Sequence, residues 1–295
     1  MINIRRKSII AKTLANYTEV LKPRETSLLT FVGVCTAVIA GGGHPPTGAL
    51  LFALITILLG SAGVNGLTNY LDRDVDAKMQ RTKRRALPSK RIYPAERVLP
   101  LTVGLTIIGL ALAWYLQTVY RLCFLAGLVG TIAAVTWRKK TTCVFPQGMV
   151  ASCAPVLIGW FSLRPTLNWE ILLLCGLIAF WLPLHVWSVM IANREDYINA
   201  GLTFFPMSRE PKDAAKVLLV FGLVAVMAAI ALYFMGHFTL LYLIVSGVLS
   251  IAVVYTSLRL VISSASRDAW RLYKLSAFPY LGLLFLTMCL DIWLL

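Results

Sequence analysis

The stretch that decides the fold reads Asn69-Tyr70-Leu71-Asp72-Arg73-Asp74-Val75-Asp76, and it stands at the end of a long apolar run. On a helix, Asn69, Asp72 and Asp76 fall at i, i+3 and i+7 and share one face, whereas Asp74 points away. Carboxylates at i and i+4 lie about 5–6 Å apart and repel each other by about 3 kcal/mol at an effective dielectric constant near 20. A divalent cation relieves this repulsion, and Mg²⁺ shares such hard oxygen ligands with substrate phosphates. The spacing therefore predicts a Mg²⁺ site.

A basic segment follows these acids directly. Its charged residues are Lys78, Arg81, Lys83, Arg84 and Arg85. Arginine offers planar, two-pronged recognition of phosphate oxygens, which suits a diphosphate. Pro88 and Pro94 exclude one unbroken helix through this part of the chain. We predict that residues 71–97 form a cytoplasmic active-site loop, although spacing does not settle which of its basic side chains face inward.

The composition is that of an integral membrane protein. Apolar residues make up 58% of the chain and charged residues only 14%, with a mean hydropathy of +0.76, whereas soluble domains carry about 25% charged residues. A membrane-spanning helix needs about 20 mostly apolar residues. Nine runs meet this need: 26–43, 48–70, 98–118, 121–137, 144–163, 169–192, 214–236, 238–262 and 276–294. We predict an all-α, nine-transmembrane-helix bundle that forms a single domain over residues 1–295.

The net charge of +15 is distributed in a way that argues against a nucleic-acid partner. With a cytoplasmic N-terminus, nine spans leave only Arg121 and Arg164 among the basic loop residues on the outer side. This asymmetry follows the positive-inside rule and predicts cytoplasmic active-site loops in a multi-pass cell-membrane protein. Residues 1–25 are basic, with apolar residues at near-helical spacing, and we expect them to lie at the lipid interface.

A second acidic cluster, Asn193-Arg194-Glu195-Asp196-Tyr197, follows the sixth run. Runs two and six are both even, so both clusters end on the same side of the membrane. We predict that Asp196, with Asn193 or Glu195, joins the metal site, and that residues 193–213 form a second cytoplasmic active-site loop. A histidine inside a span is a functional candidate by default, and His185 lies two turns earlier; its alternative role is a hydrogen bond between helices.

Simpler readings exist for these motifs. The first acidic cluster could be a solvated helix end whose carboxylates pair with Arg73 and Lys78. Acids near a helix C-terminus oppose the helix dipole, however, and need a cation. The six cysteines show no CxxC pair, so neither a disulfide framework nor a zinc site is indicated.

At these residues the chain resembles the UbiA superfamily of intramembrane prenyltransferases, and within it the branch that farnesylates haem. The superfamily motif NxxDxxxD stands at Asn69, Asp72 and Asp76, and the longer motif of the haem branch is similar to residues 69–82. Further similarities are Lys22-Pro23-Arg24, Lys139-Lys140-Thr141, Leu184-His185 and Asp196-Tyr197-x-x-Ala200-Gly201. The chain departs from the branch at Arg85-Ala86-Leu87, where Arg-Pro-Leu is usual, and at Thr203-Phe204-Phe205-Pro206.

The resemblance implies an activity: transfer of a farnesyl group from farnesyl diphosphate to a vinyl group of haem B, which gives haem O. It implies Mg²⁺ held by Asn69, Asp72, Asp76 and Asp196. It implies diphosphate binding by Lys22, Arg81, Arg85 and Lys139. His185 would lie near the porphyrin, and the product would pass to haem A synthase or to terminal oxidase assembly.

Two alternatives remain open. One is prenylation of another aromatic or tetrapyrrole acceptor, such as a quinone or chlorin precursor. The other is a secondary transporter of an anionic metabolite. Transporters often show inverted repeats and broken midplane helices, and we find no such symmetry in this sequence.

Overall fold

The computed structural model describes residues 2–116, 148–236 and 238–294, and every regular element within these ranges is helical. The longer elements are α1 (Ile2–Val20), α2 (Pro23–Ala40), α3 (Thr47–Asp76), α4 (Leu99–Leu116), α6 (Met149–Phe161), α7 (Trp169–Ala192), α9 (Pro211–Met235), α10 (Leu240–Ser263), α11 (Ser266–Leu275) and α12 (Leu283–Leu294). The shorter ones are α8 (Arg194–Asn199), the 3-10 helix η1 (Ala95–Val98) and the π-helical segment η3 (Ser276–Gly282). The predicted all-α class is confirmed.

Several of these helices can cross a membrane. Six stretches within the described ranges are long and apolar enough: Thr47–Asp76, Ala95–Trp114, Trp169–Ala192, Pro211–Met235, Leu240–Ser263 and Ser266–Leu294. Helix α2 corresponds to the predicted run 26–43, and α6 to part of 144–163. The predicted span 121–137 lies outside the described residues, so the total of nine stays a prediction.

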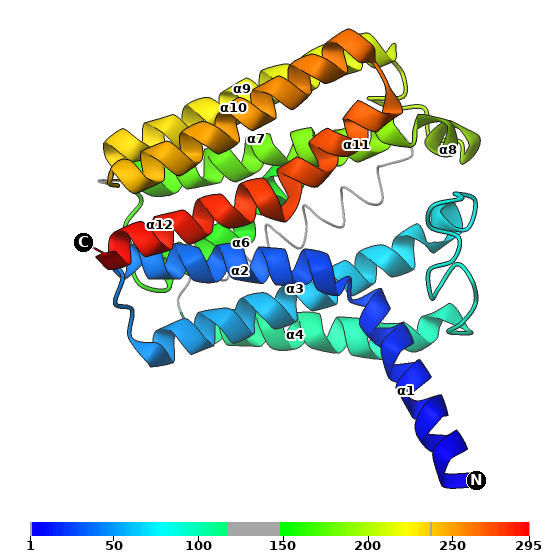
Figure 1. Cartoon of the computed structure of the whole chain (residues 1–295). Helices are drawn as coiled ribbons and strands as arrows, with labels where there is room; N and C mark the ends of the chain where they lie inside the picture. Colours follow the sequence, from blue (N-terminus) through cyan, green and yellow to red (C-terminus); the bar gives the residue numbers. More distant parts are fainter. Residues whose placement is uncertain (1, 117–147, 237, 295) are drawn as a thin grey trace.

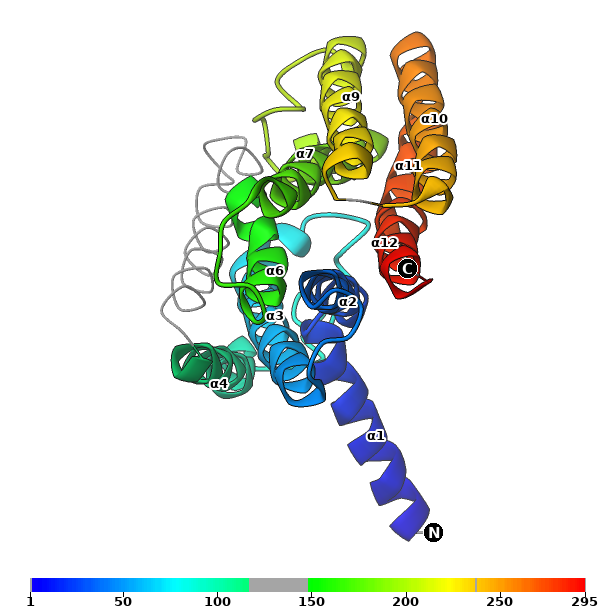
Figure 2. The same cartoon turned by 90° about the vertical axis from the view of Figure 1, so that its left-hand side faces the viewer.

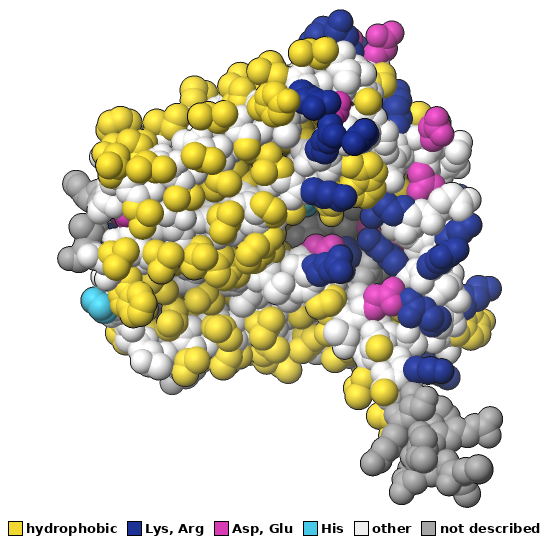
Figure 3. Space-filling view, viewed as in Figure 1, with side chains coloured by type: hydrophobic (Ala, Val, Ile, Leu, Met, Phe, Trp, Pro, Cys, Tyr) yellow, Lys and Arg dark blue, Asp and Glu magenta, His cyan; other side chains and the backbone are white. Residues whose placement is uncertain are grey.

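The helices lie side by side and form one bundle (Figures 1 and 2). Helix α2 packs against α3, α6 and α12, while α7 packs against α6, α9 and α11. On the face seen in Figure 3, apolar side chains are spread over the part of the bundle away from the charged end, as expected for a surface that faces lipid. The connections after α3 and α7 both emerge at the same end of the bundle (Figure 1).

Glycines let the central helices approach closely. A Cβ on Gly159 would lie 2.0 Å from the backbone oxygen of Gly33, so α2 and α6 meet backbone to backbone. A Cβ on Gly63 would lie 2.6 Å from the backbone nitrogen of Thr106, so α3 also approaches the backbone of α4 closely. Small residues at helix crossings are typical of membrane bundles, where close van der Waals packing replaces the hydrophobic effect.

Three predicted boundaries change in the structure. Helix α3 continues through Asp76, where Ala77 N still donates to Arg73 O at 3.0 Å, so the connection starts at Ala77 and not at residue 71. Residues 1–25 divide into α1, a turn, and the first residues of α2. Helix α1 projects from the bundle (Figure 1), and its contact with lipid stays a prediction. The predicted run 276–294 opens with η3 around Pro279, directly after α11.

Candidate active site

Three α3 side chains form the base of the site. Asn69, Asp72 and Asp76 are only 7%, 6% and 5% exposed, whereas the side chain of Asp74 is 76% exposed. The helical spacing predicted this division, and the structure confirms it. Two carboxylates buried on one helix face are costly unless they find compensating positive charge.

The end of α1 closes one side of this face. Asn69 Nδ2 donates to Val20 O at 2.6 Å, while Asn69 Oδ1 is buried and has no hydrogen-bond partner among the described residues. Lys22 Nζ donates to Thr68 Oγ1 at 3.0 Å. Since Thr68 precedes Asp72 by one turn, Lys22 lies beside the same face. An acceptor oxygen left over on Asn69 suits a cation or a donor from a substrate.

Arg85 provides the positive charge for Asp76. Its Nη1 lies 2.9 Å from Asp76 Oδ2, and Thr82 Oγ1 donates to Asp76 O at 3.0 Å. Of the basic side chains that spacing left undecided, Arg85 is half-buried, whereas Arg81, Lys83 and Arg84 are exposed. Arg81 Nη2 instead donates to Tyr197 OH at 3.2 Å.

Asp196 joins the two acidic segments. Its Oδ1 accepts from Gln80 N at 2.6 Å and its Oδ2 from Arg81 N at 3.0 Å. The two clusters therefore meet at one end of the bundle, as the even-numbered spans predicted. In this arrangement Asp196 holds the turn at residues 80–81. Among the described residues, no three His, Cys, Asp or Glu side chains gather in a metal-binding group, so direct metal binding by Asp196 stays a prediction.

The neighbours of Asp196 make other contacts, and the part of Asn193 or Glu195 in metal binding stays a prediction. Glu195 is exposed, and Asn193 Nδ2 donates to Val189 O of its own helix at 2.7 Å. Arg194 reaches across the second loop, where its guanidinium donates to Pro206 O at 3.1 Å and Met207 O at 2.8 Å. The predicted loop 193–213 thus contains the short helix α8, and its last residues already belong to α9.

The first loop is fixed to α1 by contacts that sequence reasoning missed. Arg91 Nη2 donates to Glu19 Oε2 at 2.5 Å, and Ala86 N donates to Glu19 Oε1 at 3.1 Å. Proline has no N–H to donate, so the departure from Arg-Pro-Leu at Ala86 has a structural use here. No sequence signal links Glu19 to a loop so far along the chain.

His185 is held in a stack of rings rather than among the acids. Its ring lies 4.9 Å from that of Trp181 and 4.5 Å from that of Tyr273, and Nδ1 lies 3.0 Å from Ser276 Oγ. Tyr273 belongs to α11, which packs against α7. The contacts of His185 are therefore with α7, α11 and η3, and none of them is with the acidic side chains of α3.

The charges at this end of the bundle are mostly positive. Figure 3 shows Lys and Arg side chains gathered there around a recess. Lys139, predicted to bind the diphosphate, lies outside the described residues. The site therefore combines buried carboxylates, a buried amide oxygen without a partner among the described residues, and arginines. It lies at one end of an apolar helical bundle, which is the arrangement of a membrane protein that binds a charged ligand.

Comparison with known proteins places this architecture in a family. Residues 27–283 match the profile of the UbiA prenyltransferase family. A protoheme IX farnesyltransferase of Desulforudis audaxviator is 34% identical over 96% of this chain and 90% of its own length. A second, from Symbiobacterium thermophilum, is 31% identical over 95% of each chain. This chain belongs to the UbiA prenyltransferase family.

Solved structures share the fold. A digeranylgeranylglyceryl phosphate synthase structure superimposes with a TM-score of 0.77 at 15% identity, over 96% of this chain and 99% of the other. A UbiA homologue from Archaeoglobus fulgidus bound to DMAPP and Mg²⁺ superimposes with a TM-score of 0.69 at 15% identity, over 95% of this chain and 99% of the other.

Proposed function

We propose that this chain transfers a farnesyl group from farnesyl diphosphate to a vinyl group of haem B, giving haem O and diphosphate. The observation that carries the proposal is the buried face of Asn69, Asp72 and Asp76 with Arg85 against it. The names of the two relatives, which cover nearly the whole chain, support haem as the acceptor.

The residues present fit Mg²⁺ as the cofactor. Asn69 Oδ1 is a buried oxygen without a hydrogen-bond partner in the described part of the chain, and Asp72 and Asp76 add hard carboxylate oxygens. Mg²⁺ usually takes one or two carboxylates and completes its shell with water and phosphate oxygens. When bound, Mg²⁺ supplies Lewis-acid stabilisation of the leaving diphosphate, worth several kcal/mol.

The chain's own residues would bind and orient the diphosphate. Arg85 and Lys22 flank the acidic face and would donate to phosphate oxygens as negative charge develops on them. Arg81 enters from the turn that Asp196 holds, and the resemblance adds Lys139. Asp196 acts as a positioning residue for this turn, in addition to the predicted role in metal binding.

The apolar bundle would protect the reaction from water. Breaking the C–O bond sends its electron pair to diphosphate and leaves an allylic carbocation, which water would quench. The vinyl carbon of haem attacks this cation, and water then adds to the new cation on the porphyrin side chain with loss of a proton. His185 stacks on Tyr273 two turns before the end of α7 that leads to Asp196, and it is proposed to stand near the porphyrin. The hand-over of haem O to haem A synthase or oxidase assembly stays a prediction.

The test is a product analysis with purified protein in lipid nanodiscs. Haem B, a quinone precursor and a chlorin precursor are each supplied with farnesyl diphosphate and Mg²⁺, and products are identified by mass spectrometry. We expect farnesylated haem and stoichiometric diphosphate release that stops on addition of EDTA. Farnesylation of the quinone or chlorin precursor alone would contradict haem as the acceptor. Uptake of the diphosphate into sealed proteoliposomes of the same protein, without C–O cleavage, would indicate the transporter. Geranyl and geranylgeranyl diphosphate in parallel define the preferred isoprenoid length.

A further inference from the structure

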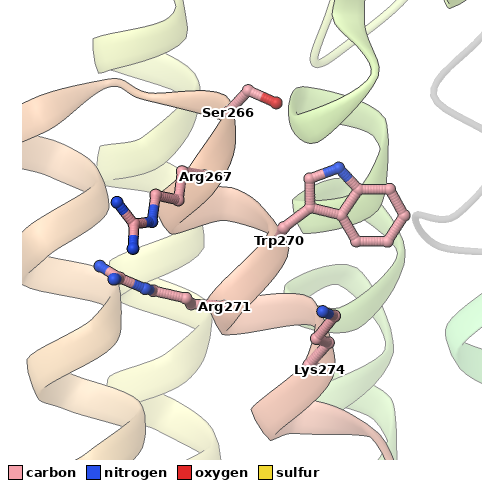
Figure 4. Close-up of a pocket in the computed structure, with 5 residues that line it drawn as sticks. All are labelled: Ser266, Arg267, Trp270, Arg271 and Lys274. Atoms are coloured by element: carbon pink, nitrogen blue, oxygen red, sulfur yellow. The ribbon is translucent and has the colours of Figure 1, made fainter.

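A second basic pocket lies on α11, apart from the acidic face of α3. Ser266, Arg267, Trp270, Arg271 and Lys274 line a pocket of about 650 Å³, a volume within the range of small-molecule sites. Figure 4 shows Arg267 and Arg271 on one side of the helix and Trp270 on the other. Ala269 and Leu272 are buried on the face that packs into the bundle. The pocket therefore combines cationic groups with an indole ring at one edge of the bundle.

The positive charge in this pocket is only partly neutralised. Arg271 Nη1 lies 2.7 Å from Asp268 Oδ1, and Arg259 approaches the same oxygen at 3.4 Å. Within the described ranges, Arg267 and Lys274 have no carboxylate within 4.0 Å. Both side chains are exposed. Two cations without a protein counter-charge are suited to an anionic ligand with two acidic groups.

A line of aromatic rings connects this pocket with the active site. Trp270 contacts Tyr273 with 5.4 Å between ring centroids, and Tyr273 stacks on His185 at 4.5 Å. His185 lies on α7, and just beyond the end of that helix Asp196 accepts from Gln80 N and Arg81 N of the first loop. Helix α11 is anchored at this point because Ser266 Oγ donates to Ala192 O at 2.6 Å. The pocket and the diphosphate end thus border the same row of rings.

We propose that this pocket binds the carboxylates of the acceptor porphyrin, an inference that rests on the proposed function. Haem B carries two propionates on one pair of pyrroles and two vinyl groups on the other pair. Arg267 and Lys274 take the carboxylates, and Trp270 packs against the macrocycle. The vinyl edge then points along Tyr273 toward Arg81 and Arg85, where the farnesyl cation forms. The two anionic substrates are thereby separated: diphosphate at α3, carboxylates at α11.

The test removes the two uncompensated charges and compares two forms of the acceptor. The double variant Arg267→Gln/Lys274→Gln is measured with haem B and with haem B dimethyl ester, which lacks the carboxylates. We expect the KM for haem B to rise at least tenfold, while kcat and the KM for farnesyl diphosphate stay within twofold. The KM for the diester should be the same in wild type and variant. The matched control, Lys12→Gln/Lys216→Gln, removes two exposed charges elsewhere and should leave all values unchanged.

Two results would overturn the proposal. One is an equal rise in KM for haem B and for its diester, because the pocket would then not read carboxylates. The other is a loss that follows the content of anionic lipid in the nanodisc rather than the form of the acceptor, because the pocket would then hold a phospholipid headgroup. Absorbance titration of haem B and its diester without farnesyl diphosphate repeats the comparison as binding alone. If the wild-type protein binds haem B more tightly than its diester in this titration but forms no farnesylated haem, the proposed function is refuted. The proposal that the pocket binds porphyrin carboxylates would then still stand.

Discussion

At the scale of single residues, the candidate active site depends on which side of α3 a carboxylate occupies. Asp74 lies between Asp72 and Asp76 in sequence but points to the surface, where Arg73 approaches it at 3.8 Å. Asp72 and Asp76 are almost completely buried. Acids near the bilayer are expensive and are usually retained for function, so these neighbouring residues offer a direct comparison of a site carboxylate with a surface carboxylate.

Asp72→Asn keeps the shape of the side chain and removes its charge. We expect the rate of diphosphate release to fall about a thousandfold, equivalent to about 4 kcal/mol, because a proposed metal ligand and its charge are lost. Asp74→Asn is the matched control and should stay within twofold of wild type. Both variants should reach the membrane in equal amounts by immunoblot. Equal activity in the two variants would exclude Asp72 from the site.

Asp196→Asn tests the positioning of the first loop. The carboxylate accepts from two backbone amides, Gln80 N and Arg81 N, and hydrogen bonds to charged groups contribute about 1.5–3 kcal/mol each. We expect these two amides to exchange with solvent at least tenfold faster, measured by hydrogen–deuterium exchange, and the KM for farnesyl diphosphate to rise. Glu195→Gln changes an exposed neighbour and should alter neither. Unchanged protection of Gln80 in Asp196→Asn would contradict the positioning role.

At the scale of elements, hydropathy predicted where helices lie better than where they end. The charged residues from Asp72 to Asp76 lower the hydropathy of α3, yet backbone hydrogen bonds carry the helix through them. The break at η3 depends on Pro279, which lacks an N–H, within a stretch that is mostly apolar. The shared face of the acids followed from the helical period. The partners of Arg81 and Arg85, which are Tyr197 and Asp76, could not be predicted from this period, because these contacts depend on how the loop folds back on the helices.

Gly159→Ala tests the close contact between α6 and α2 at Gly33. The added Cβ would lie 2.0 Å from Gly33 O, so α2 and α6 must separate, and overpacking of this kind costs about 1–3 kcal/mol. We expect a lower midpoint of thermal denaturation in detergent. Gly176→Ala on α7 is the matched control, since nothing lies within 4 Å of its added Cβ and alanine favours helix. A midpoint for Gly159→Ala at or above that of Gly176→Ala would contradict this account of the crossing.

At the scale of the whole molecule, charge is distributed unevenly between the two ends of the bundle. One end carries the two acidic segments and most of the basic side chains (Figure 3). At the other end, Arg164 is paired with Glu170 at 3.2 Å and lies over the ring of Trp160 at 5.4 Å. Basic residues near span ends are retained on the cytoplasmic side. The sequence predicted that the second and sixth spans end on the same side of the membrane. The contact of Asp196 with the loop that follows the second span could be seen only in the folded chain.

The orientation of the bundle can be tested by cysteine labelling. In a background with all six cysteines replaced by serine, Lys83→Cys marks the end with the active site and Thr166→Cys the opposite end. Both native side chains are exposed. We expect a membrane-impermeant maleimide to label Thr166→Cys in intact spheroplasts and Lys83→Cys only in inverted vesicles, because the positive-inside rule keeps the basic loop in the cytoplasm. Labelling of Lys83→Cys from outside would invert the topology. The diphosphate site would then face away from the compartment where water-soluble farnesyl diphosphate is made, and the proposed reaction would lose its substrate supply.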